Sequence, residues 1–520
     1  MHATHCPVPN SAYGIGMADQ ATIAEEAVAP DEPVVADEVA TDDSAVAEEA
    51  AAPDELAEEY EVIVLGLGPG GEEVAERLAE AGRRVLGIET HLTGGECPYY
   101  GCIPSKMVVR AAETLAEAGR VDRLAGTSSI SPDYRKPASR IRDEATDDWN
   151  DQAAVDRLRK LGGHFVRGFG RLAGRDDTGR PRVSVGERTF TADRLVIATG
   201  TAPLLPDIPG LAELAGERLS PDGRVWTNRE VLQIREAPQS LLVLGGGAVG
   251  CELAQSFARF GVRVTQLELA ERILAPEEPE ASAVVAQVLG REGVELHTGV
   301  HIAGVHRDGS GVRIDLADGR SFTAERLLVA AGRRGHLPEI AVDSIGLDPQ
   351  VGTLRVDEHM QVADRVYAVG DVTGRGPFTH VAVWQARVLI AHLLDRPEPY
   401  GGYHGLAWVT FTDPEVGRVG MSERQARDGG IEVAVGTAEI ASNTRGWIHG
   451  PGNDGFIKLV VDRSADVLVG ATVVAPTGGE ILGLLTLAVH ARVPLATLRS
   501  MHYAYPTLHR AVSEALQAVG

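Results

Sequence analysis

The chain has 520 residues, a length that suggests roughly three domains of ordinary size. Its formal net charge of −25 excludes a basic surface for nucleic acid, and four cysteines are too few for a secreted, disulfide-stabilised protein. No apolar run approaches the roughly 18 residues that a membrane span needs, and the first residues lack the pattern of a signal peptide. We therefore expect a cytoplasmic protein without a membrane anchor.

The negative charge is concentrated at the N-terminus. Residues 1–59 contain fifteen Asp and Glu residues and no Lys or Arg, so they supply −15 of the −25 and leave −10 for the rest. The segment is rich in Ala and Pro and nearly free of aromatic residues, a composition typical of disorder. We expect a disordered acidic tail, either a solvating segment or a docking arm.

The first ordered segment has the pattern of a dinucleotide-binding unit. A short apolar strand at 61–65 runs into a glycine-rich turn and then a helix at 72–81. In such a turn the first glycine allows a tight bend, the second lets a phosphate approach, and the third lets the helix pack closely. A second strand at 84–88 ends in an acid at the spacing that suits ribose hydroxyls. The residues concerned are Gly66, Gly68, Gly71 and Glu89.

Two cysteines separated by four residues follow in the sequence GGECPYYGCIPSK at residues 94–106. A disulfide between Cys97 and Cys102 would close too small a loop to stabilise the fold much. Pro104 favours a helix start that puts Cys102 at the helix N-terminus, where the reactive thiolate is favoured. We interpret the two as a redox-active pair. Reduced core cysteines and half of a zinc site are the alternatives, although no other cysteine lies at ligand spacing.

A second copy of the dinucleotide pattern occupies residues 240–268. It consists of a strand at 240–244, a helix at 251–260 and a second strand at 262–267. Glu268 directly follows the second strand. A carboxylate accepts from a ribose 2′-hydroxyl but repels a 2′-phosphate, so NAD(H) is favoured over NADP(H), although Arg263 and Arg272 are near in sequence. Two such units indicate two dinucleotide cofactors. The glycines of the second turn are Gly245, Gly247 and Gly250.

The remaining segments complete an α/β fold with two Rossmann-like domains. Residues 120–150, rich in charge and proline, suggest an exposed excursion. From about residue 400 the pattern changes to β-rich alternation and then helices at 480–491 and 507–518, which indicates an α+β domain. Three further apolar strands are each followed by a glycine turn, at Gly200, Gly332 and Gly370. We expect the chain to be divided into an acidic tail at residues 1–59 and further domains or segments at 60–205, 206–335, 336–399 and 400–520.

With two dinucleotide motifs flanking a cysteine pair, the chain resembles the class I pyridine nucleotide-disulfide oxidoreductases. This family of flavoproteins includes dihydrolipoyl dehydrogenases, glutathione reductases and mercuric reductases, and the resemblance covers about residues 60–520. Residues 94–106 are similar to the family signature GGTCxNxGCIPSK, with Glu96 in place of Thr. Further similarities are to the pyridine-nucleotide motif at 244–254, the second FAD motif at 367–371 and the opening of the dimerisation domain at 413–420.

The resemblance implies how the cofactors and cysteines are used. The domain at 60–205 would bind FAD, with Glu89 at the adenosine ribose and Asp371, from the 336–399 segment, at the ribityl chain. The domain at 206–335 would bind NAD(P), and residues 400–520 would form a homodimer. Electrons would pass from NAD(P)H through FAD to the disulfide, Cys102 contacting the flavin and Cys97 exchanging with substrate. Lys106 and Glu252 match a pair that lies beside the flavin in the family.

The C-terminus departs from the family pattern. Where the family has an HPxxxE stretch with a His–Glu acid–base dyad, this chain has Tyr505 and Arg510. An unperturbed tyrosine titrates at about 10 and is a poor base near neutral pH. Tyr505 is instead suited to hydrogen-bond a quinone or to stabilise a thiolate, and His502 and His509 flank the gap.

Three functions remain open on the sequence. The favoured one is an NAD(P)H:disulfide oxidoreductase of the dihydrolipoyl dehydrogenase type, with a small disulfide as substrate and no metal. The alternative is a diaphorase that reduces quinones or metal ions from the flavin, because the dyad is absent. The third is a redox-sensing subunit that docks through the acidic tail.

Overall fold

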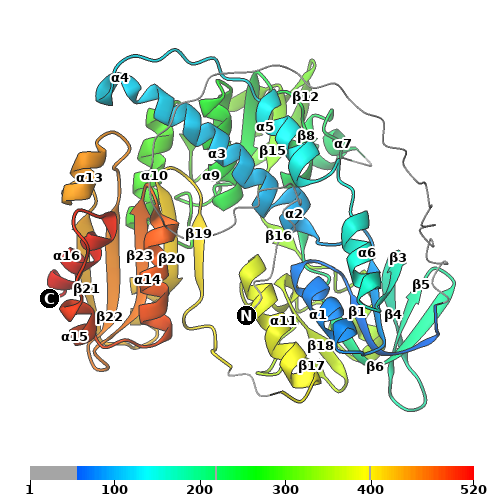
Figure 1. The fold of residues 1–520 in the computed structure, drawn as a ribbon. Coiled ribbons are helices and arrows are strands. Elements are labelled where there is room, and N and C mark those ends of the chain that lie inside the picture. The colour runs from blue at the N-terminus through cyan, green and yellow to red at the C-terminus, as the bar shows by residue number, and fades with distance from the viewer. Residues whose placement is uncertain (1–55, 217–218, 397–399) are drawn as a thin grey trace, which may run out of the picture. The chain divides into compact units, whose positions relative to one another are not determined.

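A computed structural model of the chain describes residues 56–216, 219–396 and 400–520 (Figure 1). The acidic tail expected at 1–59 lies outside the described residues as far as residue 55. Its expected end is wrong, because the first strand, β1 (Glu59–Leu65), already pairs Glu59 with Thr191. Within the described part of the chain, no helix has the length and apolar character needed to cross a membrane.

The first sheet is mainly parallel and carries the first dinucleotide turn. Its order is β17-β18-β6-β1-β2-β3, with the hairpin of β4 and β5 attached to β6. Helix α1 (Pro69–Glu80) packs against α11 (Thr379–Leu393), and the apolar residues of both share a core with β1. The strands are β1, β2 (Val85–Glu89), β3 (His164–Arg167), β4 (Gly170–Arg175), β5 (Pro181–Val185), β6 (Arg188–Ile197), β17 (Gln361–Ala363) and β18 (Val366–Ala368).

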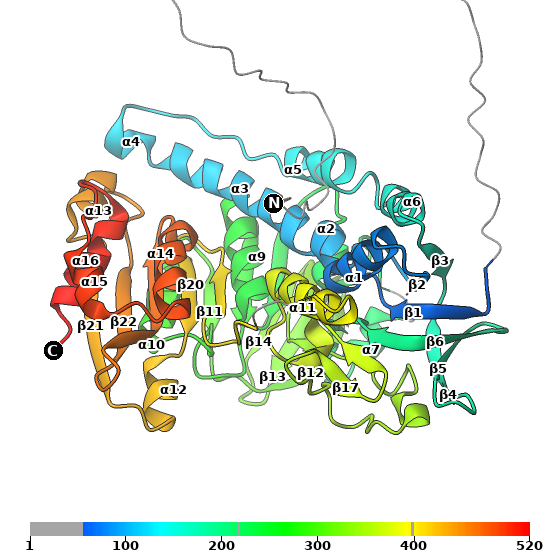
Figure 2. The ribbon, with the colours of Figure 1, turned by 60° about the horizontal axis from the view of Figure 1, so that its bottom comes forward.

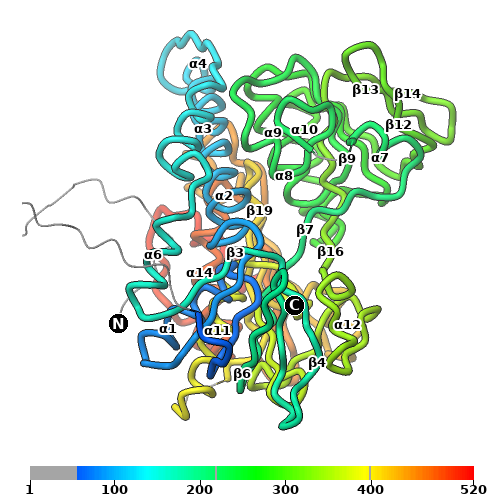
Figure 3. Tube along the Cα trace, turned by 90° about the vertical axis from the view of Figure 1, so that its right-hand side faces the viewer, coloured from blue at the N-terminus to red at the C-terminus, as the bar shows by residue number. Residues whose placement is uncertain are grey.

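A late segment of the chain completes this sheet. Strand β18 runs parallel to β6 with Val366 beside Leu195, although the whole second unit separates them in sequence. The chain crosses between the two units through β7 (Ala202–Pro203) and β16 (Arg333–Arg334), which pair antiparallel (Figure 3). The 336–399 segment therefore returns to the first sheet.

The second sheet is entirely parallel, in the order β11-β10-β9-β15-β8, and holds the second dinucleotide turn. Helix α9 (Ala248–Arg259) follows β9, and helix α10 (Pro279–Arg291) leads to β11. A small antiparallel sheet of β12 (Ile302–Asp308), β13 (Gly311–Leu316) and β14 (Ser321–Ala324) follows. The parallel strands are β8 (Val225–Trp226), β9 (Ser240–Leu244), β10 (Arg263–Leu267), β11 (Glu295–His297) and β15 (Arg326–Val329).

The C-terminal sheet is antiparallel, in the order β19-β20-β23-β22-β21. Helix α14 (Gly478–His490) packs on β20 and β23, and α16 (Ala511–Gln517) packs on β21 and β22. The strands are β19 (Ala407–Thr410), β20 (Glu415–Gly420), β21 (Val433–Glu439), β22 (Phe456–Asp462) and β23 (Val467–Ala475), and the short helices are α12 (Glu423–Asp428), α13 (Thr444–His449) and α15 (Leu495–Ser500). This is the predicted α+β arrangement.

Two sequence expectations need correction. Both dinucleotide helices begin three residues earlier than predicted, at Pro69 and Ala248, because each helix takes in part of its glycine turn. The excursion at 120–150 is exposed without interruption only over residues 122–132, and its second half buries one face. Residues Tyr134, Ala138 and Ile141 share one helical face through α5 (Arg135–Arg140) and are buried, and the Tyr134 ring stacks on Phe257 at 5.3 Å.

Candidate active site

The two cysteines lie at the junction of two helices. Cys97 is in the short helix α2 (Glu96–Tyr100), and Cys102 is the first residue of α3 (Cys102–Gly119), as the position of Pro104 predicted. Both are thiols rather than a disulfide, and a hydrogen bond joins them. Cys97 is buried and Cys102 is exposed. Helix α3 extends beside α9, so the cysteine pair lies near both dinucleotide units (Figure 2).

The environment of Cys102 favours its thiolate. The hydrogen bond from Cys97, a second from Thr379 and the charge of Lys106 together lower the pKa of Cys102 to about 6, against a smaller opposing effect of burial. The Thr379 hydroxyl oxygen lies 3.3 Å from the Cys102 sulfur and comes from the start of α11. Sequence reasoning missed Thr379, because 277 residues separate it from Cys102 and no local motif marks it.

Lys106 and Glu252 form the expected ion pair. The Lys106 Nζ lies 2.5 Å from Glu252 Oε2 and 4.7 Å from the centre of the Phe411 ring. Glu252 is 5% exposed, and its Oε1 accepts a hydrogen bond from the Phe411 amide at 2.8 Å. The buried carboxylate therefore has a charged partner on one oxygen and a backbone donor on the other, as a buried charge requires.

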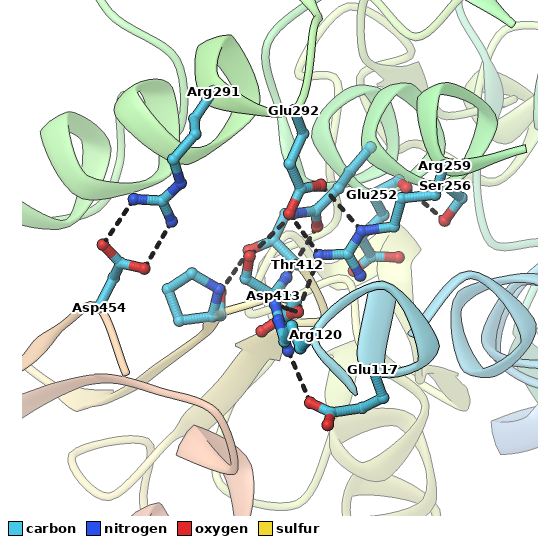
Figure 4. Close-up of polar contacts among 12 residues, drawn as sticks. Glu117, Arg120, Glu252, Ser256, Arg259, Arg291, Glu292, Thr412, Asp413 and Asp454 are labelled. Carbon is cyan, nitrogen blue, oxygen red and sulfur yellow. Dashed lines mark hydrogen bonds and ion pairs between the residues drawn. The ribbon is translucent and has the colours of Figure 1, made fainter. Parts of the chain in front are cut away.

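Helix α9 presents a row of polar side chains to residues 411–413. Glu252, Gln255 and Arg259 lie three and four residues apart on one helical face. Gln255 exchanges two hydrogen bonds of 2.8 Å with the backbone of Asp413, and Arg259 donates to Asp413 Oδ2 at 2.8 Å. Arg120, just beyond the end of α3, donates to the same oxygen at 2.7 Å (Figure 4). These contacts tie α3 and α9 to the start of the C-terminal sheet.

The first dinucleotide turn is shaped as predicted. The Leu67 amide donates to Glu89 Oε2 at 2.7 Å. A Cβ atom on Gly66 would lie 2.5 Å from the Ala198 carbonyl oxygen, and one on Gly71 would lie 2.0 Å from the Gly66 carbonyl oxygen. A Cβ atom on Gly68 would meet no atom within 4 Å. The first and third glycines are thus required by packing, and the second leaves the backbone open to a phosphate.

The second turn repeats this arrangement residue for residue. Glu268 accepts hydrogen bonds from the amide of Gly246 and, at 2.6 Å, from the amide of Ala270. A Cβ atom on Gly245 or Gly250 would meet a carbonyl oxygen at 2.3 or 2.2 Å, whereas Gly247 has open space. Both turns therefore fit a pyrophosphate at the N-terminus of the helix that follows.

The other predicted cofactor residues gather where the chain crosses between the units. Thr201, next to Gly200, donates to Asp371 Oδ2 at 2.7 Å, and Arg333, next to Gly332, donates to Thr201 Oγ1 at 2.8 Å. The Gly370 amide donates to Gln385 Oε1 at 2.7 Å.

Tyr505 lies in a different part of the chain from the cysteines. Its side chain is 66% exposed, its hydroxyl donates to Thr444 Oγ1 at 3.5 Å, and the Arg510 guanidinium lies 5.4 Å from its ring centre. Its contacts are therefore with the C-terminal domain. Among the described residues, no group of three or more His, Cys, Asp or Glu side chains is arranged to hold a metal ion.

Comparison with known proteins identifies the family. Residues 60–386 match the family described as pyridine nucleotide-disulphide oxidoreductase, and residues 406–516 match its dimerisation domain. The chain belongs to this family. It is an FAD-binding, NAD(P)-dependent oxidoreductase that acts on sulfur groups and has a homodimerisation domain.

Relatives from several organisms cover nearly the whole described chain. A dihydrolipoyl dehydrogenase of Chlorobaculum tepidum is 31% identical over 477 residues, 89% of this chain and 99% of that protein. A mercuric reductase of Streptomyces lividans is also 31% identical, over 88% of this chain and 96% of that protein. The crystal structure of LpdA from Mycobacterium tuberculosis matches with a TM-score of 0.77 and 26% identity, covering 89% of this chain and 99% of that chain. The HOCl-induced flavoprotein disulfide reductase RclA from Escherichia coli matches with a TM-score of 0.75 and 25% identity, covering 89% of this chain and 100% of that chain.

Proposed function

We propose that Cys97 and Cys102 are the redox pair of this NAD(P)H-dependent disulfide oxidoreductase. The observation that carries the proposal is the hydrogen-bonded thiol pair, whose second member begins a helix and has its pKa lowered to about 6. A low pKa in an exposed thiol distinguishes a reactive cysteine from a structural one. Cys251 provides the contrast, because burial raises its pKa to about 12.

The residues described above fit both cofactors. FAD would be held by Gly66, Gly68, Gly71, Glu89, Gly200, Gly370 and Asp371, with Lys106 beside it. NAD(P) would be held by Gly245, Gly247, Gly250, Glu268 and Gly332, with Glu252 between the two sites. When bound, FAD supplies a carrier that takes two electrons from NAD(P)H and passes them on. We assign the FAD-binding part to residues 60–205 and 336–399, the NAD(P)-binding part to 206–335 and the dimerisation domain to 400–520.

The cysteines then carry out thiol–disulfide exchange. Reduction of the Cys97–Cys102 disulfide consumes two electrons and two protons and produces two thiols. The Cys97 thiolate attacks a substrate disulfide, which forms a mixed disulfide and releases one substrate thiolate. The Cys102 thiolate attacks the Cys97 sulfur, which releases the second thiolate and restores the disulfide.

We also propose that NADH is the preferred nicotinamide cofactor. Glu268 would accept a hydrogen bond from a ribose 2′-hydroxyl and would repel a 2′-phosphate, and the two arginines near it in sequence have other positions or partners. Arg272 donates to the carbonyl oxygens of Leu274, Ala275 and Glu277 at 3.1, 2.6 and 2.9 Å. Arg263 begins β10, whereas Glu268 follows its other end.

The substrate we propose is a small disulfide of the lipoamide type, in the cytoplasm. Two of the relatives reported above support it, the dihydrolipoyl dehydrogenase by its name and the flavoprotein disulfide reductase by its class. The presence of Tyr505 in place of a histidine favours a second candidate, a diaphorase that reduces quinones from the flavin.

One assay separates the two candidates. NADH oxidation by the purified flavoprotein is measured with lipoamide and, in parallel, with a quinone, and both are repeated with Cys97→Ser. A lipoamide rate that the substitution abolishes supports the disulfide substrate. A quinone rate that the substitution leaves unchanged, without a lipoamide rate, supports the diaphorase.

A further inference from the structure

A cluster of opposite charges surrounds the residue that precedes Cys97. Glu96 Oε1 accepts a hydrogen bond from Arg229 Nε at 2.6 Å, and Glu96 Oε2 accepts one from Asn228 Nδ2 at 2.8 Å. Arg333 Nη1 lies 3.7 Å from Glu96 Oε2. We call Glu96, Asn228, Arg229 and Arg333 the Glu96 cluster. Glu96 also stands where the family signature GGTCxNxGCIPSK has Thr.

The cluster holds both ends of α2. Asn228 Nδ2 donates to the Tyr100 carbonyl oxygen at 2.8 Å as well as to Glu96. The Arg229 guanidinium lies 5.6 Å from the centre of the Tyr100 ring. Asn228 and Arg229 therefore contact the first and last residues of the helix that carries Cys97.

The residues that contact α2 are themselves held in place. They begin helix α8 (Asn228–Val231), which is fixed by a capping box between Thr227 and Glu230. The Thr227 hydroxyl donates to Glu230 Oε2 at 2.6 Å, and Glu230 is 8% exposed. Arg229 thus has a defined position beside α2.

The charges of the cluster act on Cys97 with opposite signs. Glu96 directly precedes Cys97 in the chain, and its carboxylate is hydrogen-bonded to Arg229. A negative charge near a thiol disfavours its ionisation, whereas a positive charge favours it. The side chains of Glu96 and Arg229 are 25% and 28% exposed, so solvent screens their effects only in part. The elements packed against α2 are α3 and α8. The titratable and charged groups on these three helices are Glu96, Tyr99 and Tyr100 on α2, Cys102, Lys106, Arg110, Glu113 and Glu117 on α3, and Arg229 and Glu230 on α8, and Arg333 of β16 also lies near Glu96.

We propose that Glu96 and Arg229 form a charge-balancing pair that sets the thiolate fraction of Cys97. Both are positioning residues, since they act through Cys97 and the helix that holds it. The proposal rests on the proposed function in that Cys97 is the thiol that exchanges with substrate. The presence of Glu96 where the family signature has Thr would then tune the reactivity of the Cys97 thiol.

Two single substitutions separate an electrostatic role from a structural one. The reduced holoenzyme is alkylated with iodoacetamide over a range of pH, and the rate at the Cys97 peptide is followed by mass spectrometry. Glu96→Gln is expected to accelerate Cys97 alkylation at pH 7 by about two- to fivefold, and Arg229→Gln to slow it by a similar factor. The pH midpoint should move down in the first variant and up in the second, because a positive potential favours the thiolate.

The structural alternative has a different signature. If the cluster only holds the shape of α2, both substitutions loosen the same contacts and change the Cys97 rate in the same direction. Changes of the same sign, or no change in either variant, would overturn the proposal. The double variant Glu96→Gln with Arg229→Gln supports it by returning to within about twofold of the original rate, because the two charge changes cancel.

A matched control removes an ion pair elsewhere. Asp454→Asn removes the charge from the pair in which Asp454 Oδ2 lies 2.6 Å from Arg291 Nη2 (Figure 4). Arg291 ends α10 and Asp454 precedes β22, so neither residue belongs to α2, α3 or α8. It is expected to leave the Cys97 alkylation profile unchanged. Because alkylation needs no turnover, its outcome is independent of the Cys97→Ser assay. Failure of the charge-balancing proposal is therefore distinguishable from failure of the proposed function.

Discussion

At the scale of single residues, the Thr379 hydroxyl is the contact whose effect is simplest to measure. Thr379→Val keeps the shape of the side chain and removes a hydrogen bond that stabilises the Cys102 thiolate. The thiolate is the form present above the pKa, so the midpoint of Cys102 alkylation should move from about 6 to higher pH. At pH 6 the Cys102 alkylation rate should fall by about threefold or more.

Thr114 provides the matched control, because it is an exposed threonine further along the same helix, α3. Thr114→Val should leave the Cys102 midpoint unchanged. An unaltered midpoint in Thr379→Val would show that the hydroxyl does not contribute to the low pKa.

The preference for NADH is also a property of single side chains. Because we assign Glu268 to the ribose and Arg272 donates to carbonyl oxygens, kcat/KM for NADH should exceed that for NADPH by about 10-fold or more. Steady-state kinetics with both cofactors measures this ratio. A ratio near one would contradict the assignment of Glu268.

Sequence reasoning was most successful where a residue's partner is local or part of a motif. The glycine spacing of both turns predicted Glu89 and Glu268, and the signature match predicted the pair of Lys106 and Glu252. Thr379 meets α3 across 277 residues of sequence and Arg229 meets α2 across 133, so both escaped prediction because only the folded chain brings them there.

At the scale of elements, the polar face of α9 is a buried connection between units. Asp413 is bound by Arg259 and Arg120, whose side chains are 7% and 17% exposed. Asp413→Asn removes the negative charge between two guanidinium groups that have little contact with solvent, so it should destabilise the protein by about 2 kcal/mol. A lower melting temperature in thermal denaturation is the expected result.

The control for this prediction is Asp454→Asn, whose partner Arg291 is 52% exposed. A partly exposed pair of this kind contributes about 0 to 1 kcal/mol. Equal melting temperatures for the two variants would argue against the importance of the α9 contacts.

The start of α3 followed from the position of Pro104, whereas both helices that follow glycine turns begin three residues earlier than predicted. The prediction of exposure failed where burial of one helical face decides it. The 120–150 segment was expected to be exposed on its charge and proline content. Its residues Tyr134, Ala138 and Ile141 have helical spacing and bury one face, a periodic signal that composition alone conceals.

At the scale of the whole molecule, the C-terminal domain exposes apolar side chains suited to a dimer interface. Trp447 and Ile448 of α13 are 74% and 47% exposed, and Met501 is 38% exposed. Tyr505, 66% exposed, hydrogen-bonds to Thr444 of the same helix. Adjacent exposed apolar groups of this size mark interaction surfaces. Trp447→Glu should shift the homodimer toward monomer in sedimentation velocity.

Val351→Glu is the corresponding control, because Val351 is 53% exposed but lies outside the C-terminal domain. It should leave the protein dimeric. A dimer unaffected by Trp447→Glu would place the interface on another part of the domain.

The return of the 336–399 segment to the first domain was implied only by the resemblance, through the second FAD motif at 367–371, and the strand pairing that closes the first sheet was not predicted. No local pattern indicates that β18 pairs with β6 rather than with a strand of the second unit. That pairing brings Asp371 and Thr379 to the cysteine pair's side of the molecule, so the complete site depends on it.

The measurement that tests the central claim most directly is a thiol count before and after NADH addition. The oxidised holoenzyme is treated anaerobically with excess NADH, denatured and alkylated, and each cysteine peptide is quantified by mass spectrometry. The proposed electron path predicts that Cys97 and Cys102 both become alkylated only after NADH, whereas Cys251 is alkylated with or without it. Flavin reduction by NADH without new alkylation at Cys97 and Cys102 would contradict it.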